Sequence, residues 1–216
     1  MKVKDAVLVG KVSKGNGKMP GTTFSIDAFA CQTGSKLAQQ ENTSCSKCYA
    51  RQIQRIRPSV DQGYKANLAK WESANEDQWV NSMVFQLNRY CTEDYHRWFD
   101  SGDLQSPKMF GQICEVARQT PNIKHWLPTQ ERSFVKIGRT LYGNEPGNMA
   151  VRVSGTKING KAPNEALSST VFDRQGSPEG FECRLTEGKC GPCRACWDTS
   201  IRNVAYPLNG TRQRRE

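Results

Sequence analysis

The chain has 216 residues, of which 36% are hydrophobic and 24% charged, so its composition excludes an intrinsically disordered protein and predicts a globular one. Nowhere do 18 apolar residues occur together and the N-terminal apolar run 6–9 is short, so we expect no transmembrane helix, no export signal and a cytoplasmic location. The chain has 31 Lys and Arg against 21 Asp and Glu, a net charge of +10. This charge favours a nucleic acid or an acidic protein as partner; the alternative is a basic surface that is simply solvated.

Strands and helices are expected to alternate along the first two thirds of the chain. A β-prone segment, 22–30, ends at Cys31, and a helical pattern follows Cys48 until Pro58 interrupts it. Ser106 is a capping residue before Pro107, so a helix is expected to begin there. The remaining expected elements are a helix over 60–90, a strand over 95–103 that stops in an acidic turn, a helix over 107–119, a strand over 124–131, a helix over 133–142 and a strand over 149–154.

This alternation predicts an α/β fold with a parallel sheet and right-handed crossovers. In such sheets, ligands collect at the carboxyl ends of the strands. We therefore expect one edge of the sheet to gather the residues at the predicted strand ends, which are Cys31, Asp100, Asp103, Gln130, Glu131 and Ser154. Residues 155–216 are rich in Gly, Pro, Asn and Ser and predict a loop-rich extension.

Nine cysteines occur in a chain without a predicted export signal, so they do not indicate a disulfide framework. Two groups have the spacing of metal ligands. The first cysteine group (Cys31, Cys45 and Cys48) has the pattern C-x13-C-x2-C, and the second cysteine group (Cys183, Cys190, Cys193 and Cys196) has the pattern C-x6-C-x2-C-x2-C. Cys91 and Cys114 stand alone and are expected to be core thiols.

The second cysteine group has a triple run that is typical of iron–sulfur proteins, where successive thiolates bind different irons. Cys183 is the nearest candidate for a fourth ligand. A four-cysteine zinc site also uses C-x2-C pairs, so zinc is the main alternative, and unligated thiols are the other.

The first cysteine group has only three members and no evident fourth. A [4Fe-4S] cluster held by three thiolates leaves one iron open to a small-molecule ligand. The alternative is a closed structural site whose fourth ligand is Cys91, Cys114 or a histidine.

Several segments together resemble a bacteriophage family, the gene product 88 family. They are Cys31-Gln32-Thr33, Cys45-x-x-Cys48-Tyr49-Ala50, Arg97-Trp98-Phe99-Asp100-Ser101-Gly102-Asp103, Trp126-x-Pro128-Thr129-x-x-Arg132 and Gly188-Lys189-Cys190-Gly191-x-Cys193-Arg194-x-Cys196-Trp197. The resemblance implies a phage-encoded, cysteine-ligated protein in the host cytoplasm.

A cysteine triplet at a strand end also resembles, more distantly, the radical SAM enzymes. That resemblance implies a [4Fe-4S] cluster on Cys31, Cys45 and Cys48 with S-adenosylmethionine at the open iron. It also implies that Ser101, Gly102 and Asp103 act like the family's Gly-Gly-Glu turn. Gln130 and Glu131 are added as cofactor-binding candidates because they end a neighbouring strand.

The sequence as a whole thus predicts a shortened, partial parallel β/α barrel over residues 1–154, radical-SAM-like, with the first cysteine group at its rim. Residues 155–216 form the predicted extension that carries the second group. The expected function is that of an iron–sulfur cluster-binding protein, with a radical-SAM-like or redox activity on an unidentified substrate. The alternatives are a zinc-stabilised basic module that binds nucleic acid, and a protein with structural clusters that binds an acidic host protein.

Overall fold

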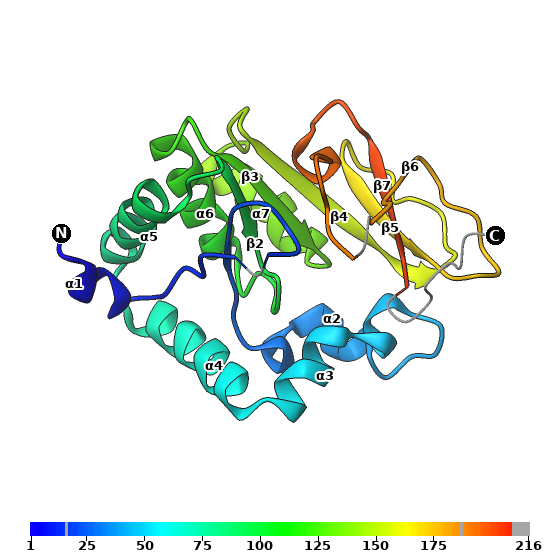
Figure 1. Ribbon diagram of the computed structural model, residues 1–216, viewed down its shortest axis with the longest axis horizontal. Coiled ribbons are helices and arrows are strands. Elements are labelled where there is room, and N and C mark those ends of the chain that lie inside the picture. Colours follow the sequence, from blue (N-terminus) through cyan, green and yellow to red (C-terminus); the bar gives the residue numbers. More distant parts are fainter. Residues whose placement is uncertain (16, 186–187, 209–216) are drawn as a thin grey trace.

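One seven-stranded parallel sheet organises the chain in the computed structural model, which describes residues 1–15, 17–185 and 188–208 (Figure 1). The strand order is β1-β2-β3-β4-β5-β7-β6, and every pairing is parallel. The strands are β1 (Thr22–Phe24), β2 (Tyr95–Trp98), β3 (Lys124–Thr129), β4 (Met149–Ile158), β5 (Ser168–Phe172), β6 (Phe181–Glu182) and β7 (Asn203–Pro207). The predicted parallel α/β fold is confirmed.

Helices fill most of the connections between the early strands. The α-helices are α1 (Val3–Val7), α2 (Gln32–Leu37), α3 (Tyr49–Ile56), α4 (Pro58–Ser73), α5 (Glu76–Tyr90), α6 (Pro107–Gln119) and α7 (Arg132–Tyr142). Three short 3-10 helices are η1 (Ala28–Ala30), η2 (Ser44–Lys47) and η3 (Ala195–Trp197). In Figure 1, α2 and α3 lie together below one end of the strands, whereas α5 and α6 lie at the far side from β7.

Three segments differ from the expected elements. The strand expected over 22–30 ends at Phe24, because the Asp27 side chain accepts a hydrogen bond from Phe29 N and starts η1. The helix expected over 60–90 is two helices, since the Asn75 side chain accepts from Gln78 N at 2.8 Å and caps α5. The boundary expected after residue 154 falls inside β4, and the residues that follow add β5, β6 and β7 to the same sheet. Residues 209–216 of the predicted extension lie outside the described part.

The sheet has one face covered by α5, α6 and α7, here called the helix-covered face. Phe24 and Trp98 from the strands pack against Trp79 of α5, with ring centroids 5.7–5.9 Å apart. His125 is part of this core, and its Nδ1 accepts a hydrogen bond from Trp98 Nε1 at 3.2 Å. Burial lowers the pKa of His125 from 6.5 to about 3, so the ring is neutral at neutral pH.

The opposite face is covered by the C-terminal part of the chain. Side chains alternate along β2, so Tyr95 and Arg97 point away from the helix-covered core. Trp197 of η3 packs on Tyr95 and Trp126, with centroids 5.2 and 5.4 Å away, and its Nε1 donates to His96 O at 2.9 Å. Residues distant in sequence therefore meet on this face.

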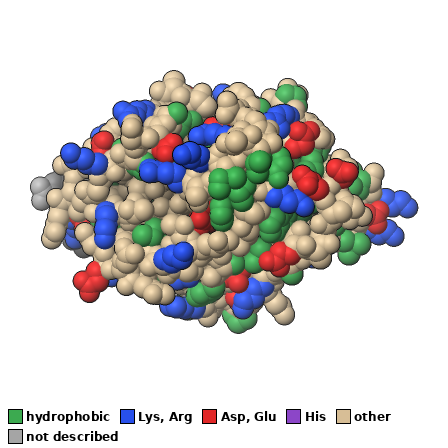
Figure 2. Space-filling view, turned by 180° about the vertical axis from the view of Figure 1, so that it is seen from behind, with side chains coloured by type: hydrophobic (Ala, Val, Ile, Leu, Met, Phe, Trp, Pro, Cys, Tyr) green, Lys and Arg blue, Asp and Glu red, His purple; other side chains and the backbone are tan. Residues whose placement is uncertain are grey.

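No helix in the described part of the chain is long and apolar enough to cross a membrane. Figure 2 shows the molecule from behind, where Lys and Arg side chains alternate with Asp and Glu rather than forming one basic surface.

Candidate cysteine sites

The first cysteine group lies beyond the carboxyl ends of β1 to β3. Cys31 follows η1, Cys45 lies in η2, and Cys48 directly precedes α3; all three are partly exposed. A Cβ placed on Gly34 would lie 3.8 Å from Cys31 Sγ and 3.6 Å from Cys45 Sγ, so both sulfurs face the same turn of α2. Burial raises the pKa of Cys31 well above its ordinary value, and the nearby Asp103, Cys48 and Cys45 raise it further. The three thiols are close enough to influence one another electrostatically.

Two residues at the end of β3 hold the segment that carries this group. Glu131 accepts from Thr33 N and from Thr33 Oγ1, each at 2.7 Å, and so caps the first turn of α2. Gln130 Nε2 donates to Ser44 Oγ and to Gly155 O, each at 3.2 Å. These bonds join the cysteine-bearing segment to the carboxyl edge of the sheet.

Asp103, after β2, joins the ends of β2 and β3. Its carboxyl group accepts from Thr129 Oγ1 at 2.6 Å, from Gln130 N at 2.8 Å and from Leu104 N at 2.8 Å. Burial raises the pKa of Asp103 to about 7, although these hydrogen bonds oppose the rise. The carboxyl group is therefore committed to holding two strand ends together.

Ser101 and Gly102 complete the predicted turn. Gly102 has φ +87°, and a Cβ there would clash with Ile26 Cγ1, so the close approach of the β1 loop requires glycine. Ser101 O accepts from Ile26 N at 3.0 Å, while the Ser101 hydroxyl is buried without a partner in the described structure. The turn thus fixes the chain that leads to Cys31.

The expected gathering at the carboxyl edge occurs, but most of the predicted cofactor-binding groups face protein. Asp103, Gln130 and Glu131 hold the cysteine-bearing segment, and Ser154 contacts Ser169, with 3.1 Å between the two hydroxyl oxygens. Direct contact between a cofactor and Ser101, Gly102, Asp103, Gln130 or Glu131 therefore stays a prediction.

The second cysteine group lies on the face of the sheet opposite the helix-covered face. Cys183 N donates to Ala205 O beside β7, and Cys190 N donates to Lys18 O, each at 2.8 Å. Burial raises the pKa of Cys183 to about 12, and Cys196, Cys190 and Cys193 raise it in that order. The four thiols are near neighbours although 13 positions separate the first from the last.

Arg152 positions the segment that carries Cys193 and Cys196. Its side chain is fully buried, and burial lowers its pKa. The guanidinium nitrogens donate over 2.6–3.4 Å to six backbone carbonyls, those of Ser168, Ala195, Cys196, Asp198, Ile201 and Arg202. One side chain from β4 therefore fixes the shape of the chain around η3.

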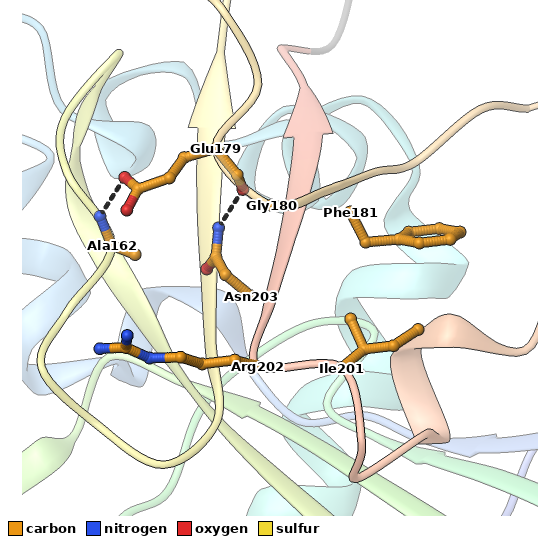
Figure 3. Close-up of a pocket in the computed structure, with 7 residues that line it drawn as sticks. All are labelled: Ala162, Glu179, Gly180, Phe181, Ile201, Arg202 and Asn203. Carbon is orange, nitrogen blue, oxygen red and sulfur yellow. Dashed lines mark hydrogen bonds between the residues drawn. The ribbon is translucent and has the colours of Figure 1, made fainter.

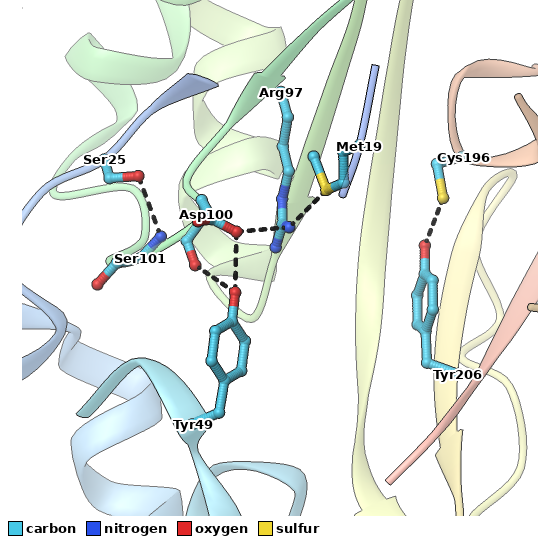
Figure 4. A network of polar contacts seen from close by, with 8 residues as sticks. All are labelled: Met19, Ser25, Tyr49, Arg97, Asp100, Ser101, Cys196 and Tyr206. Atoms are coloured by element: carbon cyan, nitrogen blue, oxygen red, sulfur yellow. Dashed lines mark hydrogen bonds and ion pairs between the residues drawn. The ribbon is translucent and has the colours of Figure 1, made fainter. Parts of the chain in front are cut away.

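Figure 4 shows Arg97 between Tyr49, at the start of α3, and Cys196 of the second cysteine group. Arg97 Nη1 and Tyr49 OH each donate to Asp100 Oδ1 at 2.8 Å, and Tyr49 directly follows Cys48. On its other side the Arg97 guanidinium lies 4.7 Å from the Trp126 ring centroid. Burial lowers the pKa of Arg97, but nearby acidic groups, including Tyr49, Asp100, Tyr206 and Cys196, raise it overall.

Tyr206 contacts the second cysteine group and, like Arg97 and Arg152, was not among the predicted site residues. Its hydroxyl lies 3.1 Å from Cys196 Sγ (Figure 4), and its ring stacks on Trp126 with centroids 6.2 Å apart. The single available signal was the position of Arg97 and Arg152 in otherwise apolar strands, where a charged side chain needs buried partners.

Cys91, Cys114 and both histidines lie away from the cysteine groups. Cys91 and Cys114 pack in the helix-covered core, as expected. His96 and His125 share that face and bond to the hydroxyls of Thr22 and Thr120, each at 2.9 Å. None of these four supplies a fourth ligand to the first group in this arrangement.

A cavity of about 270 Å³ lies elsewhere, at the amino ends of β6 and β7 (Figure 3). Asn203 closes its back wall by donating to Glu179 O at 2.6 Å, and Glu179 accepts from Ala162 N at 2.7 Å. It includes no residue predicted to bind a metal or a cofactor.

Within the described ranges, no three or more His, Cys, Asp or Glu side chains are arranged to hold a metal ion. Thiolates that bind one zinc ion converge on it, because each zinc–sulfur bond is about 2.3 Å long. On an iron–sulfur cluster each cysteine binds a different iron, so the sulfurs stand farther apart. The cysteines are gathered, but they do not form a closed shell around one ion.

Fold and sites together define a parallel α/β protein with one cysteine group at the carboxyl edge of its sheet and another on the face opposite the helices. The family model described as Gene product 88 matches residues 4–199, which is most of the chain. The chain therefore belongs to the Gene product 88 family of phage proteins. No curated protein and no solved structure matches it.

Proposed function

We propose that the protein is a phage-encoded iron–sulfur protein with two centres, acting in the host cytoplasm. The first cysteine group would hold a [4Fe-4S] cluster with one open iron, and the second group would hold a fully ligated cluster. One observation carries this proposal: three thiols gather at the carboxyl edge and four on the opposite face, while the other two cysteines and both histidines are packed in the core.

Unpartnered donors beside the second group fit such a cluster. Arg97 Nε and Trp126 Nε1 are buried without a hydrogen-bond acceptor in the described structure. Both side chains come from neighbouring strands on the face that carries the second group. Cluster sulfides and thiolates accept hydrogen bonds, so they would satisfy donors that are otherwise costly to bury.

The strand order supports the choice of the first site as the reactive one. Strands β1 to β5 are adjacent in chain order, as they are in a partial β/α barrel. A bound cluster would supply electron transfer at both groups and a Lewis-acidic iron at the first. Glu131, Gln130 and Asp103 would keep the three thiols oriented, and Arg97 would place a positive charge between the two centres.

The test is iron, zinc and sulfide analysis with absorption and EPR spectra on protein purified without oxygen. About eight irons and eight sulfides per chain would support two [4Fe-4S] clusters. Cys45→Ala and Cys193→Ala should each lose about half of the iron, from different EPR signals, and Cys114→Ala is the matched control that keeps all of it. Circular dichroism of each variant verifies that the fold is retained.

The open iron is tested by adding S-adenosylmethionine to the reduced protein. A changed EPR signal in wild type and in Cys193→Ala, absent in Cys45→Ala, would place a ligand-accepting iron at the first group. Zinc without a visible chromophore would overturn the iron–sulfur proposal and favour the zinc-stabilised binding module.

A further inference from the structure

The chain around the first cysteine group has few acidic residues and therefore a net positive charge. Residues 28–57 carry five basic side chains against one acidic side chain, Glu41; the basic ones are Lys36, Lys47, Arg51, Arg55 and Arg57. None of the five forms an ion pair with any residue in the described part of the chain. This concentration contrasts with the mixed charges of the face in Figure 2.

An exposed aromatic ring lies within this basic segment. Phe29 is 37% exposed, and the Arg51 and Arg55 guanidinium carbons lie 5.0 and 5.4 Å from its ring centroid. Arg51 is fixed by hydrogen bonds to Ala28 O at 3.3 Å and Ser35 Oγ at 2.6 Å. Both guanidinium groups thus lie over the ring, so this exposed site is an arginine–aromatic stack.

Phe29, Arg51 and Arg55 form a partly exposed surface, here called the Phe29 surface. It is close in sequence to the first cysteine group. Phe29 is two residues before Cys31, and Arg51 and Arg55 lie on α3, which starts directly after Cys48. Arg51 Nη2 also donates to Ser35 Oγ, and Ser35 follows Gly34, where an added Cβ would lie 3.8 Å from Cys31 Sγ and 3.6 Å from Cys45 Sγ.

We propose that the Phe29 surface binds single-stranded nucleic acid and presents it to the first cysteine group. Guanidinium planes and aromatic rings both stack on unpaired bases, and arginines also contact phosphates, so an arginine–aromatic stack suits such a strand. A duplex offers no free base face, so an unpaired strand fits better. The binding surface stands on its own observations, whereas the role of the strand as substrate rests on the proposed function.

The experiment measures fluorescence anisotropy of a labelled 20-nucleotide single strand with the full chain, from 50 to 300 mM salt. Phe29→Ala should weaken binding about fivefold or more, since a stacked base contributes about 1–3 kcal/mol. Phe181→Ala is the matched control, because Phe181 is 40% exposed and lies at β6. It should leave the affinity unchanged.

A second pair of variants tests the charges. Arg55→Gln should weaken binding and reduce the salt dependence. Arg89→Gln removes the same charge beside another ring, since its guanidinium carbon lies 5.9 Å from the centroid of Tyr90, and it should change the affinity less than about twofold.

Three outcomes would overturn the proposed surface. They are equal losses in Phe29→Ala and Phe181→Ala, tighter binding of the corresponding duplex, and Phe29-dependent binding to phosphatidylcholine–phosphatidylserine vesicles in place of the oligonucleotide. Iron content measured on the same samples separates this inference from the proposed function. An iron-free chain that binds the strand contradicts only the iron–sulfur proposal, and an iron-loaded chain that does not bind contradicts only the nucleic-acid surface.

Discussion

The two cysteine groups are held in different ways. The first group is attached to the sheet by side chains, Glu131 to Thr33 and Gln130 to Ser44, at the edge where strands end. The second is attached through backbone groups: carbonyls around Cys196 converge on the buried Arg152 side chain, while Cys183 N and Cys190 N donate to Ala205 O and Lys18 O. The first support relies on side chains that bridge two segments, and the second relies on the backbone.

Under the proposed function, this difference suits different tasks. A segment fixed at five carbonyls between Ala195 and Arg202 has little freedom to rearrange, which suits a centre that only exchanges electrons. A segment fixed by side chains at the carboxyl edge of the sheet, beside a basic surface, suits a centre that meets a ligand.

The largest effect is expected from Arg152→Met. The substitution leaves several buried carbonyls without donors, so the free energy of unfolding should fall by about 3 kcal/mol or more, and the second centre should lose its iron. Denaturant unfolding and iron analysis measure both effects. Arg184→Met is the control, because the Arg184 side chain is 70% exposed. Equal stability of the two variants would show that the carbonyl contacts do not hold this group.

Acid should affect both groups together. His125 has its pKa lowered from 6.5 to about 3 by burial, and burial also lowers that of His96. Above pH 6.5 the rings are neutral in folded and unfolded chains alike. Below it the imidazoles gain protons only in the unfolded chain, so the histidine contribution to stability is lost as pH falls from 6.5 toward 3. Near-ultraviolet circular dichroism follows the tryptophan core, and iron release follows the centres.

The two histidines lie on the helix-covered face, away from both groups, so iron loss and core unfolding should coincide. His125→Asn should flatten the pH dependence between 6 and 4. Iron released well before the tryptophan signal changes would instead indicate protonation at the thiolates and would separate the two groups from the core.

An intermediate effect is expected from Glu131→Gln. The neutral amide cannot accept both bonds from Thr33, so stability should fall by about 1–3 kcal/mol and the first centre alone should bind iron less well. EPR of the two signals gives the readout, with Glu115→Gln on the exposed side of α6 as control. Loss of iron from the second centre would contradict separate supports.

Local signals in the sequence were enough for many elements. Ser106 accepts from Met109 N at 3.2 Å, and α6 covers the expected 107–119. The break at Asn75 also had a signal, a capping residue followed three positions later by Gln78, but the apolar pattern on both sides suggested one helix. Where local chemistry and periodicity agree, as at α6, the element could be predicted.

The supports of the sites could not be predicted in the same way. The gathering of strand ends follows from a parallel sheet, but the pairing of β5 with β7 depends on residues 35 positions apart. Arg152 was part of an expected strand, and nothing local indicates that its partners are carbonyls at 195–202. Long-range backbone partners leave no periodic trace in the chain.

The smallest effect on stability, and the sharpest on chemistry, is expected from Tyr206→Phe. Burial keeps the pKa of Tyr206 well above its ordinary value, so the hydroxyl retains its proton and can donate to Cys196 Sγ, 3.1 Å away. A hydrogen bond to a ligating sulfur stabilises the reduced, more negative state of a cluster. Tyr206→Phe should therefore keep its iron and lower the reduction potential of the second centre only, as measured by EPR-monitored redox titration. The control is Tyr142→Phe, because Tyr142 is exposed at the end of α7. If Tyr206→Phe instead shifted the potential of the first centre, Tyr206 would act through Arg97 and the two centres would not be independent.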